Sequence, residues 1–300
     1  MIVSYRCEAL LRDCLESLRS HPPSTWMLVR VVDNASEDGT AEMVAREHPE
    51  VELTVNSSNE GFSAANNTAI RAGGAPFVLA LNPDTQVTEG ALDKMLAVME
   101  EHPEVGVGGP ELILTDGTLD HAAKRGFPTP LSALGHFTGV GRGERARGRL
   151  GAYRAPEVDR GPVDAVNGAF MLMRRAALEE VGLFDEGYWM YMEDLDLSYR
   201  LRQAGWLTWY EPGAAVTHIK AGTSGPVRSP RLNRAFHYGM FRFYRKHYAE
   251  LHSPLFNGLV YAGIGLKLVV SLLATPIRRL AARRQRAIGA GGAGGAGAQG

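Results

Sequence analysis

The first 84 residues alternate short apolar runs with amphipathic segments, and this alternation restricts the chain to one class of fold. Four apolar runs have the length of buried strands, namely residues 2–5, 27–32, 51–55 and 77–81. The segments between them, such as residues 62–71, have the apolar spacing or the polar opening turn of a helix. Strands that alternate with helices in this way predict an α/β fold with a doubly wound, mostly parallel sheet.

The fourth apolar run stops at Asn82-Pro83-Asp84, because proline cannot donate to a sheet ladder. We therefore expect Asp84 at the carboxyl end of a buried parallel strand, which is where ligands bind in open α/β sheets. An acidic residue in that place commonly meets a metal ion or a metal-bound phosphate. Asn-Pro-Asp is also good turn chemistry, so the triplet alone supports both interpretations.

The segment after the triplet contains one clear helix and one short strand before its pattern fades. Thr88 suits the N-cap of a helix with apolar residues from Leu92 to Met99, and residues 105–109 follow as a strand. Between residues 116 and 162 regular periodicity is lost. This stretch is either a solvated insertion or a mobile lid that contacts an acceptor phosphate. Its arginines are Arg142, Arg145, Arg147, Arg149, Arg154 and Arg160.

The acidic run Glu193-Asp194-Leu195-Asp196 opens a helix that Gly205 ends. It follows an apolar segment at residues 163–173 and a helix near residues 176–181. Glu193 and Asp194 precede the inward stripe by three or four residues, so both can point inward. Asp196 lies four residues before Arg200, which predicts an ion pair on the helix surface.

A histidine ends the last strand of this pattern. Residues 206–210 are followed by a Pro212-Gly213 turn, and a short strand at residues 215–218 ends at His218. A histidine in that place is either a structural residue or a ligand. The sequence has neither G-x-G-x-x-G nor G-x-x-x-x-G-K-[ST], so another group must neutralise a bound diphosphate. A divalent ion held by Asp84, with His218 as second ligand, would do so, and oxygen ligands indicate Mg²⁺ or Mn²⁺.

Charge is distributed unevenly along the chain. The segment from Arg228 to Arg286 holds 12 of the 32 Lys+Arg and a single acid, Glu250. An acidic body with a basic carboxyl end suggests an anionic partner, either lipid or nucleic acid. We expect lipid and no nucleic acid, because the same segment contains a long apolar stretch.

That apolar stretch covers residues 255–277 and carries one charge, Lys267. It is long enough to span a bilayer, but basic clusters flank it on both sides, and a span would place one of them on the wrong side. A helix at the surface of an anionic membrane explains both flanks, while a full span and a soluble packed helix remain alternatives. The Gly/Ala tail at residues 289–300 is expected to be disordered.

Five motifs of this chain, in this order, resemble those of family 2 glycosyltransferases of the rhamnosyltransferase kind, over about residues 2–248. The resemblance implies a GT-A fold in one domain, with a nucleotide-sugar half at about residues 1–110 and an acceptor half at about 111–248. A membrane-associating helical segment at 249–288 would follow. The motifs are Val31 to Thr40, Asn59-Glu60-Gly61-Phe62, Leu81 to Asp84, Asn167-Gly168-Ala169-Phe170 and Tyr191 to Leu197.

The resemblance also implies roles for single residues. Asp194 would be the catalytic base, and Asp84 with His218 would hold the metal. Glu193 and Asp164 are possible supporting residues. The sequence departs from the family at Arg6, where asparagine is common, and at Asn82, which replaces the first aspartate of the metal motif. Residues expected to bind the donor are Ser4, Asp33, which would contact the base, Gly61, Asn67, Asn82 and Asp84.

The expected function is an inverting transfer of sugar, with dTDP-rhamnose as favoured donor and a lipid-linked saccharide of the cell envelope as acceptor. One carboxylate base is enough for such a displacement. The alternatives are a sugar nucleotidyltransferase, for which a glycine-rich basic loop near the amino end is missing, and an inactive sugar-nucleotide-binding scaffold. We expect a cytoplasmic protein held on the inner face of the membrane.

Overall fold

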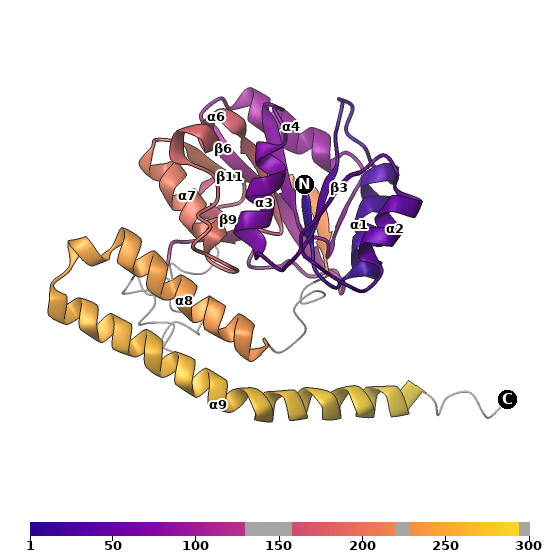
Figure 1. Ribbon diagram of the computed structural model, residues 1–300. Coiled ribbons are helices and arrows are strands. Elements are labelled where there is room, and N and C mark those ends of the chain that lie inside the picture. Colours follow the sequence, from indigo (N-terminus) through magenta and orange to yellow (C-terminus); the bar gives the residue numbers. More distant parts are fainter. Residues whose placement is uncertain (130–157, 220–227, 294–300) are drawn as a thin grey trace. The chain divides into compact units, whose positions relative to one another are not determined.

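The computed structural model describes residues 1–129, 158–219 and 228–293, with side chains described as far as residue 276. The chain divides into two compact units, Met1–Thr223 and Ser224–Gly300 (Figure 1). The sequence placed the domain boundary later, after residue 248. The earlier division reflects the helix that precedes residue 248, which packs on the long C-terminal helix of the second unit.

The first unit is built on a nine-stranded sheet of the described residues, in the order β3-β2-β1-β4-β10-β6-β11-β5, with β8 paired to β11. Its first part is parallel, as the sequence predicts. The strand order reverses between β1 and β4, so the carboxyl ends of these two strands flank the switch point where ligands bind. The parallel strands are β1 (Ile2–Ser4), β2 (Arg30–Asp33), β3 (Glu52–Val55) and β4 (Phe77–Leu81).

The second part of the sheet adds antiparallel strands, which periodicity alone does not reveal. β10 runs antiparallel to both β4 and β6, and β5 and β8 run antiparallel to β11. A separate two-stranded sheet pairs β7 with β9. These strands are β5 (Thr85–Val87), β6 (Val105–Leu114), β7 (Lys124–Arg125), β8 (Gly161–Val163), β9 (Ala165–Val166), β10 (Phe170–Arg174) and β11 (Leu207–His218).

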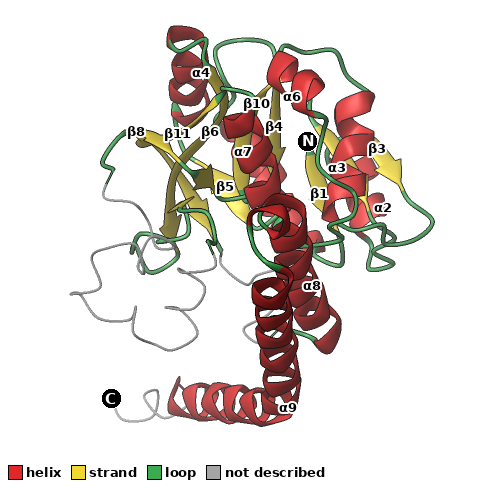
Figure 2. Cartoon of the chain, turned by 90° about the vertical axis from the view of Figure 1, so that its left-hand side faces the viewer, coloured by secondary structure: helices red, strands yellow, loops and turns green. Residues whose placement is uncertain are grey.

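Helices cover both faces of the sheet (Figure 2). Side chains of α1, α2 and α4 join one hydrophobic core, and those of α3, α6 and α7 join the other. β10 shows the alternation that separates the cores, because Phe170 and Leu172 enter the first while Met171 and Met173 enter the second. The helices are α1 (Glu8–Ser20), α2 (Thr40–Glu47), α3 (Phe62–Arg71), α4 (Ala91–Glu101), α6 (Arg175–Val181) and α7 (Glu193–Gln203).

Three local predictions were wrong. Pro212-Gly213 is a register shift inside one long strand, because β11 continues along β6 on both sides of it. Gly90 caps α4 in place of Thr88, whose hydroxyl donates instead to the carbonyl of Ala215 at 2.6 Å. The stretch without periodicity contains β7 and β8, which are too short to produce a periodic signal.

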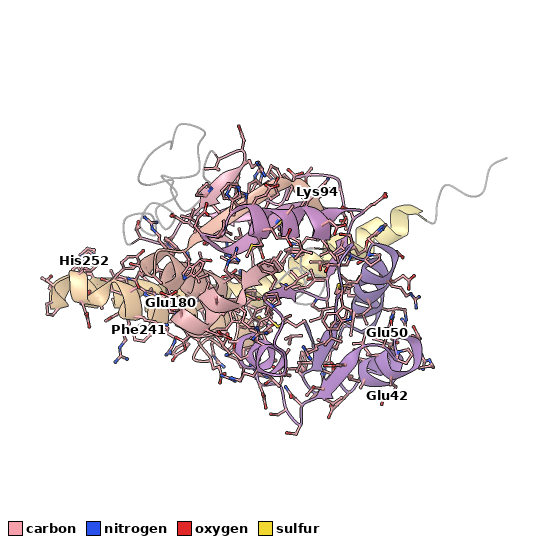
Figure 3. The ribbon with its side chains drawn as sticks, turned by 90° about the horizontal axis from the view of Figure 1, so that it is seen from above. Glu42, Glu50, Lys94, Glu180, Phe241 and His252 are labelled. Atoms are coloured by element: carbon pink, nitrogen blue, oxygen red, sulfur yellow. The ribbon has the colours of Figure 1, made fainter. Side chains whose placement is uncertain are left out.

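The second unit is a helical hairpin of α8 (Pro230–His247) and α9 (Pro254–Ala293), joined by the 3₁₀ turn η1 (Ala249–Leu251). Phe241 on α8 and His252 in the connection are labelled in Figure 3. The stretch Pro254–Pro276 is the one helix of the described residues that is long and apolar enough to cross a membrane. The helix α9 extends into the predicted Gly/Ala tail as far as Ala293, and residues 294–300 lie outside the described part.

Candidate active site

The triplet that ends β4 is both a turn and the carboxyl end of a strand. The carbonyl of Asn82 accepts from the amide of Thr85 at 3.2 Å, which closes the turn. The amide of Asn82 donates to the carbonyl of Ala169 at 2.9 Å, which ties the turn to the loop before β10. Asp84 is 3% exposed. The triplet is therefore a turn, and this turn presents a buried carboxylate at the switch point.

Strand pairing brings His218 to this carboxylate. His218 pairs with Thr85 in the antiparallel register of β11 with β5, and the amide of Ile219 donates to the carbonyl of Asp84 at 2.8 Å. Nε2 of His218 lies 3.8 Å from Oδ1 of Asp84. Its Nδ1 lies 3.1 Å from Oδ2 of Asp120, a buried carboxylate that the sequence did not indicate.

This pair has a donor set suited to a divalent cation. No three His, Cys, Asp or Glu side chains converge as a complete metal site within the described ranges. The carboxylate and imidazole can supply two ligands, and diphosphate oxygens and water complete the coordination of ions bound in this way. Asp120 can accept from Nδ1–H of His218, and in that tautomer Nε2, the nitrogen nearer Asp84, keeps the lone pair that a metal ligand needs.

Asp194 occupies the first turn of α7, where the helix dipole favours a negative charge. One carboxylate oxygen accepts from the amide of Gly168 at 3.0 Å and from the guanidinium of Arg125, and the other accepts from the amide of Leu195 at 2.8 Å. A Cβ at Gly168 would lie 3.3 Å from this carboxylate, so the glycine permits the close approach. These three donors hold the carboxylate in one position at the start of α7.

The neighbouring Glu193 has a raised pKa. Burial, together with the charge of Asp194, raises the pKa of Glu193 to about 8, and its Oε2 is buried without a hydrogen bond in the described structure. Glu193 is therefore mainly neutral at pH 7. The two adjacent carboxyl groups therefore have different surroundings, because Asp194 accepts from a guanidinium and two backbone amides while Oε2 of Glu193 lacks such a donor in the described structure.

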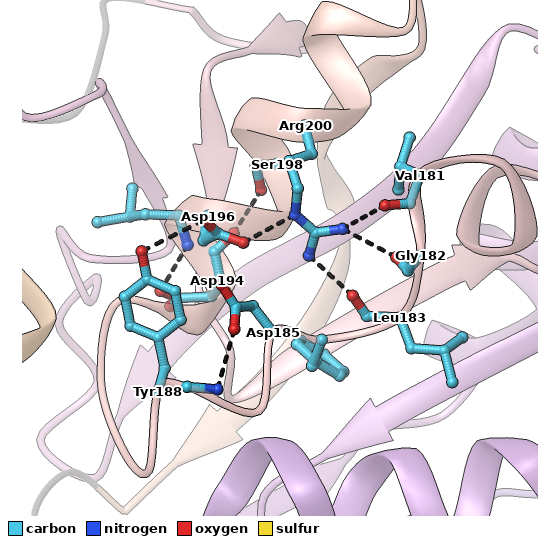
Figure 4. A network of polar contacts seen from close by, with 12 residues as sticks. Val181, Gly182, Leu183, Asp185, Tyr188, Asp194, Asp196, Ser198 and Arg200 are labelled. Carbon is cyan, nitrogen blue, oxygen red and sulfur yellow. Dashed lines mark hydrogen bonds and ion pairs between the residues drawn. The ribbon is translucent and has the colours of Figure 1, made fainter. Parts of the chain in front are cut away.

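Asp196 forms the predicted ion pair with Arg200, but the prediction of a surface pair was wrong. Asp196 is 0% exposed, accepts from Arg200 Nε at 2.8 Å and also accepts from the hydroxyl of Tyr188 at 3.2 Å (Figure 4). The guanidinium also binds the carbonyl groups of Val181, Gly182 and Leu183 (Figure 4). This network attaches the loop after α6 to α7 and so fixes the helix that carries Asp194.

Asp33 lies at the carboxyl end of β2, in register with Ser4 of β1. Its carboxylate accepts from the amide of Ser36 at 3.1 Å and from the hydroxyl of the same serine, and this contact orders the polar loop after β2. Ser4 is fully buried with its hydroxyl 3.2 Å from Cys7 Sγ. The side chain of Ser4 is therefore packed inside the protein at the carboxyl end of β1.

Gly61 and Asn67 connect α3 to the loop that precedes Asp194. Gly61 has φ +90°, and a Cβ there would lie 2.3 Å from the carbonyl oxygen of Trp189. The side-chain amide Nδ2 of Asn67 donates to the carbonyl of Phe184 and to the carboxylate of Glu186, both at 2.8 Å. The side-chain oxygen Oδ1 of Asn67 accepts from the backbone amide of Phe184. Both residues thus hold the loop at residues 184–189 against the start of α3.

Strained backbone marks the same edge of the sheet. Within the described residues, five non-glycine residues have positive φ, and all lie in loops around Asp33 or directly before Glu193. Tyr191 and Met192 are consecutive, with φ of +71° and +74°. Such conformations cost about 1–3 kcal/mol each and cluster at functional sites. The other three are Arg6, Ala35 and Glu37.

The segment from Asp120 to Arg125 joins the two carboxylate sites. Asp120 holds His218, Arg125 on β7 holds Asp194, and the amide of Asn167 donates to the carbonyl of Ala123 between them at 3.2 Å. Sequence analysis missed this segment, because it lies in the stretch without periodicity and matches no motif.

Other predicted residues of this stretch have separate positions. Asp164 accepts from Arg202 at 2.6 Å and from the amide of Phe127 at 3.2 Å, so it fastens the segment after β7 to α7. Arg160 pairs with Glu211 at 2.6 Å. The other arginines of the predicted lid, from Arg142 to Arg154, lie outside the described residues.

Comparison with known proteins matches most of the chain to one described family. Residues 1–235 match the family described as "Glycosyltransferase like family 2". The chain is 34% identical over 223 residues to the N-acetylglucosaminyl-diphospho-decaprenol L-rhamnosyltransferase of Mycobacterium tuberculosis, an alignment that covers 70% of this chain and 71% of the relative.

Two solved structures share the fold at low sequence identity. GalNAc-T7, solved with UDP, GalNAc and Mn²⁺, aligns with a TM-score of 0.59 at 16% identity over 81% of this chain and 46% of that protein. The mannosyltransferase PcManGT of Pyrobaculum calidifontis, solved with GDP-Man and Mn²⁺, aligns with a TM-score of 0.56 at 19% identity over 98% and 78%. These matches bear on the fold alone.

Proposed function

The chain belongs to family 2 of the glycosyltransferases and has the GT-A fold, and from this premise we propose that it transfers a sugar by a single inverting displacement. The donor is a nucleoside-diphosphate sugar, and an acceptor hydroxyl attacks its anomeric carbon. The observation that carries the proposal is the link between two buried carboxylates: Asp194 accepts from the amide of Gly168, and the carbonyl of the next residue, Ala169, accepts from the turn that presents Asp84.

Asp194 is the catalytic base of this proposal. As the bond between the acceptor oxygen and the anomeric carbon forms, the hydroxyl proton moves to the carboxylate and the nucleoside diphosphate leaves with the electrons of the broken bond. Arg125, Gly168 and Leu195 hold the carboxylate in place through three donors. Neutral Glu193 adds no second charge, so a single carboxylate acts as the base, which is enough for a single inverting displacement.

The donor lies along the carboxyl ends of β1, β2 and β4 in this proposal. Asp33 and its Ser36 loop face the base, and Asn82 with Asp84 faces the diphosphate. Asp84 and His218 would hold Mg²⁺ or Mn²⁺, and the nitrogen ligand suits a transition-metal ion better than Mg²⁺. When bound, such an ion stabilises the charge that grows on the leaving diphosphate. Ser4, Gly61 and Asn67 act through the loops that they support.

The sugar and acceptor follow from the sequence resemblance and from the mycobacterial relative. We favour L-rhamnose from dTDP-rhamnose as the donor sugar, and a diphosphate-linked polyprenyl saccharide of the cell envelope as the acceptor. The name of the relative specifies an N-acetylglucosaminyl-diphospho-decaprenol acceptor and an L-rhamnosyl product. The apolar helix α9 supports a site of action at the cytoplasmic face of the membrane, where a lipid-linked acceptor is anchored.

A donor screen tests this function directly. Purified protein is given a panel of nucleotide sugars with Mn²⁺, with and without a polyprenyl-diphosphate N-acetylglucosamine acceptor, and nucleoside diphosphate release is measured. We expect acceptor-dependent release from dTDP-rhamnose, and a product with inverted anomeric configuration. Formation of nucleoside triphosphate and sugar 1-phosphate on addition of inorganic pyrophosphate would identify a nucleotidyltransferase, and a retained configuration would exclude the single displacement.

A further inference from the structure

Polar contacts align α8 and α9 side by side in opposite directions. The hydroxyl of Tyr244 donates to Asn257 at 2.6 Å near the connection, and Asn233 bonds to Ser271 at 2.7 Å and to Thr275 at 3.4 Å at the other end. Asn257 and Thr275 are about 27 Å apart along the helix axis at 1.5 Å per residue. The two helices therefore remain paired along nearly the whole apolar stretch of α9.

The side chains of α9 are arranged inside out relative to a soluble helix. Its polar residues Asn257, Ser271 and Thr275 face α8 through the contacts above. The opposite stripe, at spacings of three and four residues, is exposed and entirely apolar. Its large members are Leu255 at 78%, Leu259 at 66%, Leu266 at 67%, Val269 at 53%, Val270 at 57% and Leu273 at 71% exposure.

The face of α8 that points away from Asn233 is basic. At helical spacing Arg231, Arg234, Arg242 and Arg245 lie on this side together with Tyr238, which is 51% exposed. The four arginines are spread over 14 residues, or about 21 Å of helix. One outer surface of the hairpin is thus apolar and the other is cationic over its whole length.

These two surfaces do not suit a hairpin that crosses the bilayer. In a crossing, the paired α8 would carry Arg231 and Arg234 to one side of the membrane and Arg242 and Arg245 to the other, against the distribution of basic residues at membrane helices. Lys267, ten residues from Asn257, would lie about 15 Å deep, near the bilayer centre, where a charge is costly.

We infer that the hairpin of α8 and α9 lies flat on an anionic phospholipid surface, with the exposed stripe of α9 immersed below the headgroups and the arginines of α8 at phosphate level. This orientation buries the apolar stripe, satisfies every arginine on one side and leaves the polar contacts between the helices intact. The inference deepens the proposed function, because it defines how the enzyme is held at the surface that contains its acceptor.

Spin-label depth measurements distinguish a flat hairpin from a spanning one. Leu255→Cys, Leu266→Cys and Leu273→Cys each place a label on the apolar stripe, and the native Cys7 and Cys14 are buried. On vesicles of phosphatidylcholine and phosphatidylglycerol, we expect the three labels at one depth, within about 5 Å of each other. A label at Tyr238→Cys should be shallower than all three. A label at position 266 about 10 Å deeper than the other two would overturn the inference.

Charge variants test the lipid that the surface recognises. Arg234→Gln with Arg245→Gln should weaken binding to the anionic vesicles about 25-fold, at about fivefold for each arginine. Arg19→Gln with Arg46→Gln removes the same charge from exposed sites of the first unit and should change binding little. An equal loss of vesicle binding in the two double variants would contradict binding through the basic face of α8. If the full chain dimerises through α9 and does not bind vesicles, the partner of this surface is a second copy of the chain and not lipid.

Vesicle binding and label depth are measured without any sugar donor. A negative result in these two measurements would therefore not bear on the transfer reaction, which the nucleoside diphosphate assay tests separately.

Discussion

Asp84 and Asp194 lie at the same edge of the sheet, but they have opposite kinds of partner. Asp84 faces an imidazole nitrogen at 3.8 Å, and Asp120 orients that ring from behind. Asp194 is already bound by a guanidinium and by two backbone amides. Arginine remains charged at any relevant pH, whereas a neutral histidine offers a lone pair.

The difference shows how two carboxylates of one site can take separate roles. The pair of Asp84 and His218 combines a carboxylate with an imidazole nitrogen, which is a donor set that suits a cation and, through it, a diphosphate. The Asp194 carboxylate already accepts from a guanidinium and two backbone amides, so a cation gains less there, and we propose this carboxylate as the base. Each prediction below changes one side of this comparison.

The largest effect is expected from Asp194→Asn, which removes the proposed base and keeps the shape of the side chain. Transfer should fall about 1000-fold, because general bases contribute 10²–10⁴ in rate, while nucleotide-sugar affinity should stay within about twofold. Stopped assays of nucleoside diphosphate release give the rate. Asp13→Asn on the exposed side of α1 is the matched control and should retain full activity. Turnover near the wild-type level in Asp194→Asn would remove this residue as base.

Asp84→Asn should lower transfer about 100-fold and abolish the dependence of transfer on Mn²⁺, because the only proposed carboxylate ligand is lost. The measurement is the rate across a Mn²⁺ titration with EDTA-treated protein. If the variant keeps the wild-type response to Mn²⁺, then Asp84 does not bind the metal.

Asp120→Asn should weaken the apparent Mn²⁺ affinity about tenfold without removing it, in line with the usual cost of losing a partner behind a ligating histidine. An asparagine can donate to Nδ1 of His218 and so turn the other nitrogen into a donor, which cannot bind a metal. The saturating rate should stay close to wild type. Equal losses in Asp120→Asn and Asp84→Asn would mean that Asp120 is itself a ligand.

Glu193→Gln should alter stability in a pH-dependent manner. The unfolded chain releases this proton near the ordinary pKa of 4.5, while the folded protein keeps it up to about 8. The folded state therefore binds more protons in this window, and wild-type stability declines as pH rises from 4.5 to 8. Glutamine does not titrate, so the stability of the variant relative to wild type should rise by roughly 4 kcal/mol between pH 4.5 and pH 8.

Thermal unfolding at pH 5, 6.5 and 8 would show this gain as a difference that widens with pH. Glu179→Gln on the exposed side of α6 is the control and should show a constant difference. A constant difference in Glu193→Gln as well would mean that Glu193 is ionised in the folded protein.

The sequence predicted much of the first half of the fold, because its strands are continuous apolar runs and its helices are amphipathic. Phe62–Arg71 and Phe77–Leu81 have the predicted bounds. The antiparallel strand β5 was missed since it has only three residues, and its pairing with β11 is what brings His218 to Asp84. Long-range pairing of this kind leaves no periodic signal.

The candidate site shows the same limit. Asp84 and Asp194 are located by motifs and His218 by its place at the end of a strand, but Asp120 and Arg125 reach His218 and Asp194 from a segment with no pattern. Asp196 has the spacing of a surface ion pair, and only the packing of Tyr188 and the loop after α6 buries it. The charge of Glu193 depends on burial, which its sequence neighbours do not determine.

Calorimetric titration of nucleoside diphosphate into Asp84→Asn and Asp194→Asn, with and without Mn²⁺, tests the division of roles most directly. Our account predicts that Asp194→Asn binds the diphosphate with the Mn²⁺ enhancement of the wild type, whereas Asp84→Asn binds it weakly and equally in both conditions. Loss of the Mn²⁺ enhancement in Asp194→Asn, with its retention in Asp84→Asn, would contradict the assignment.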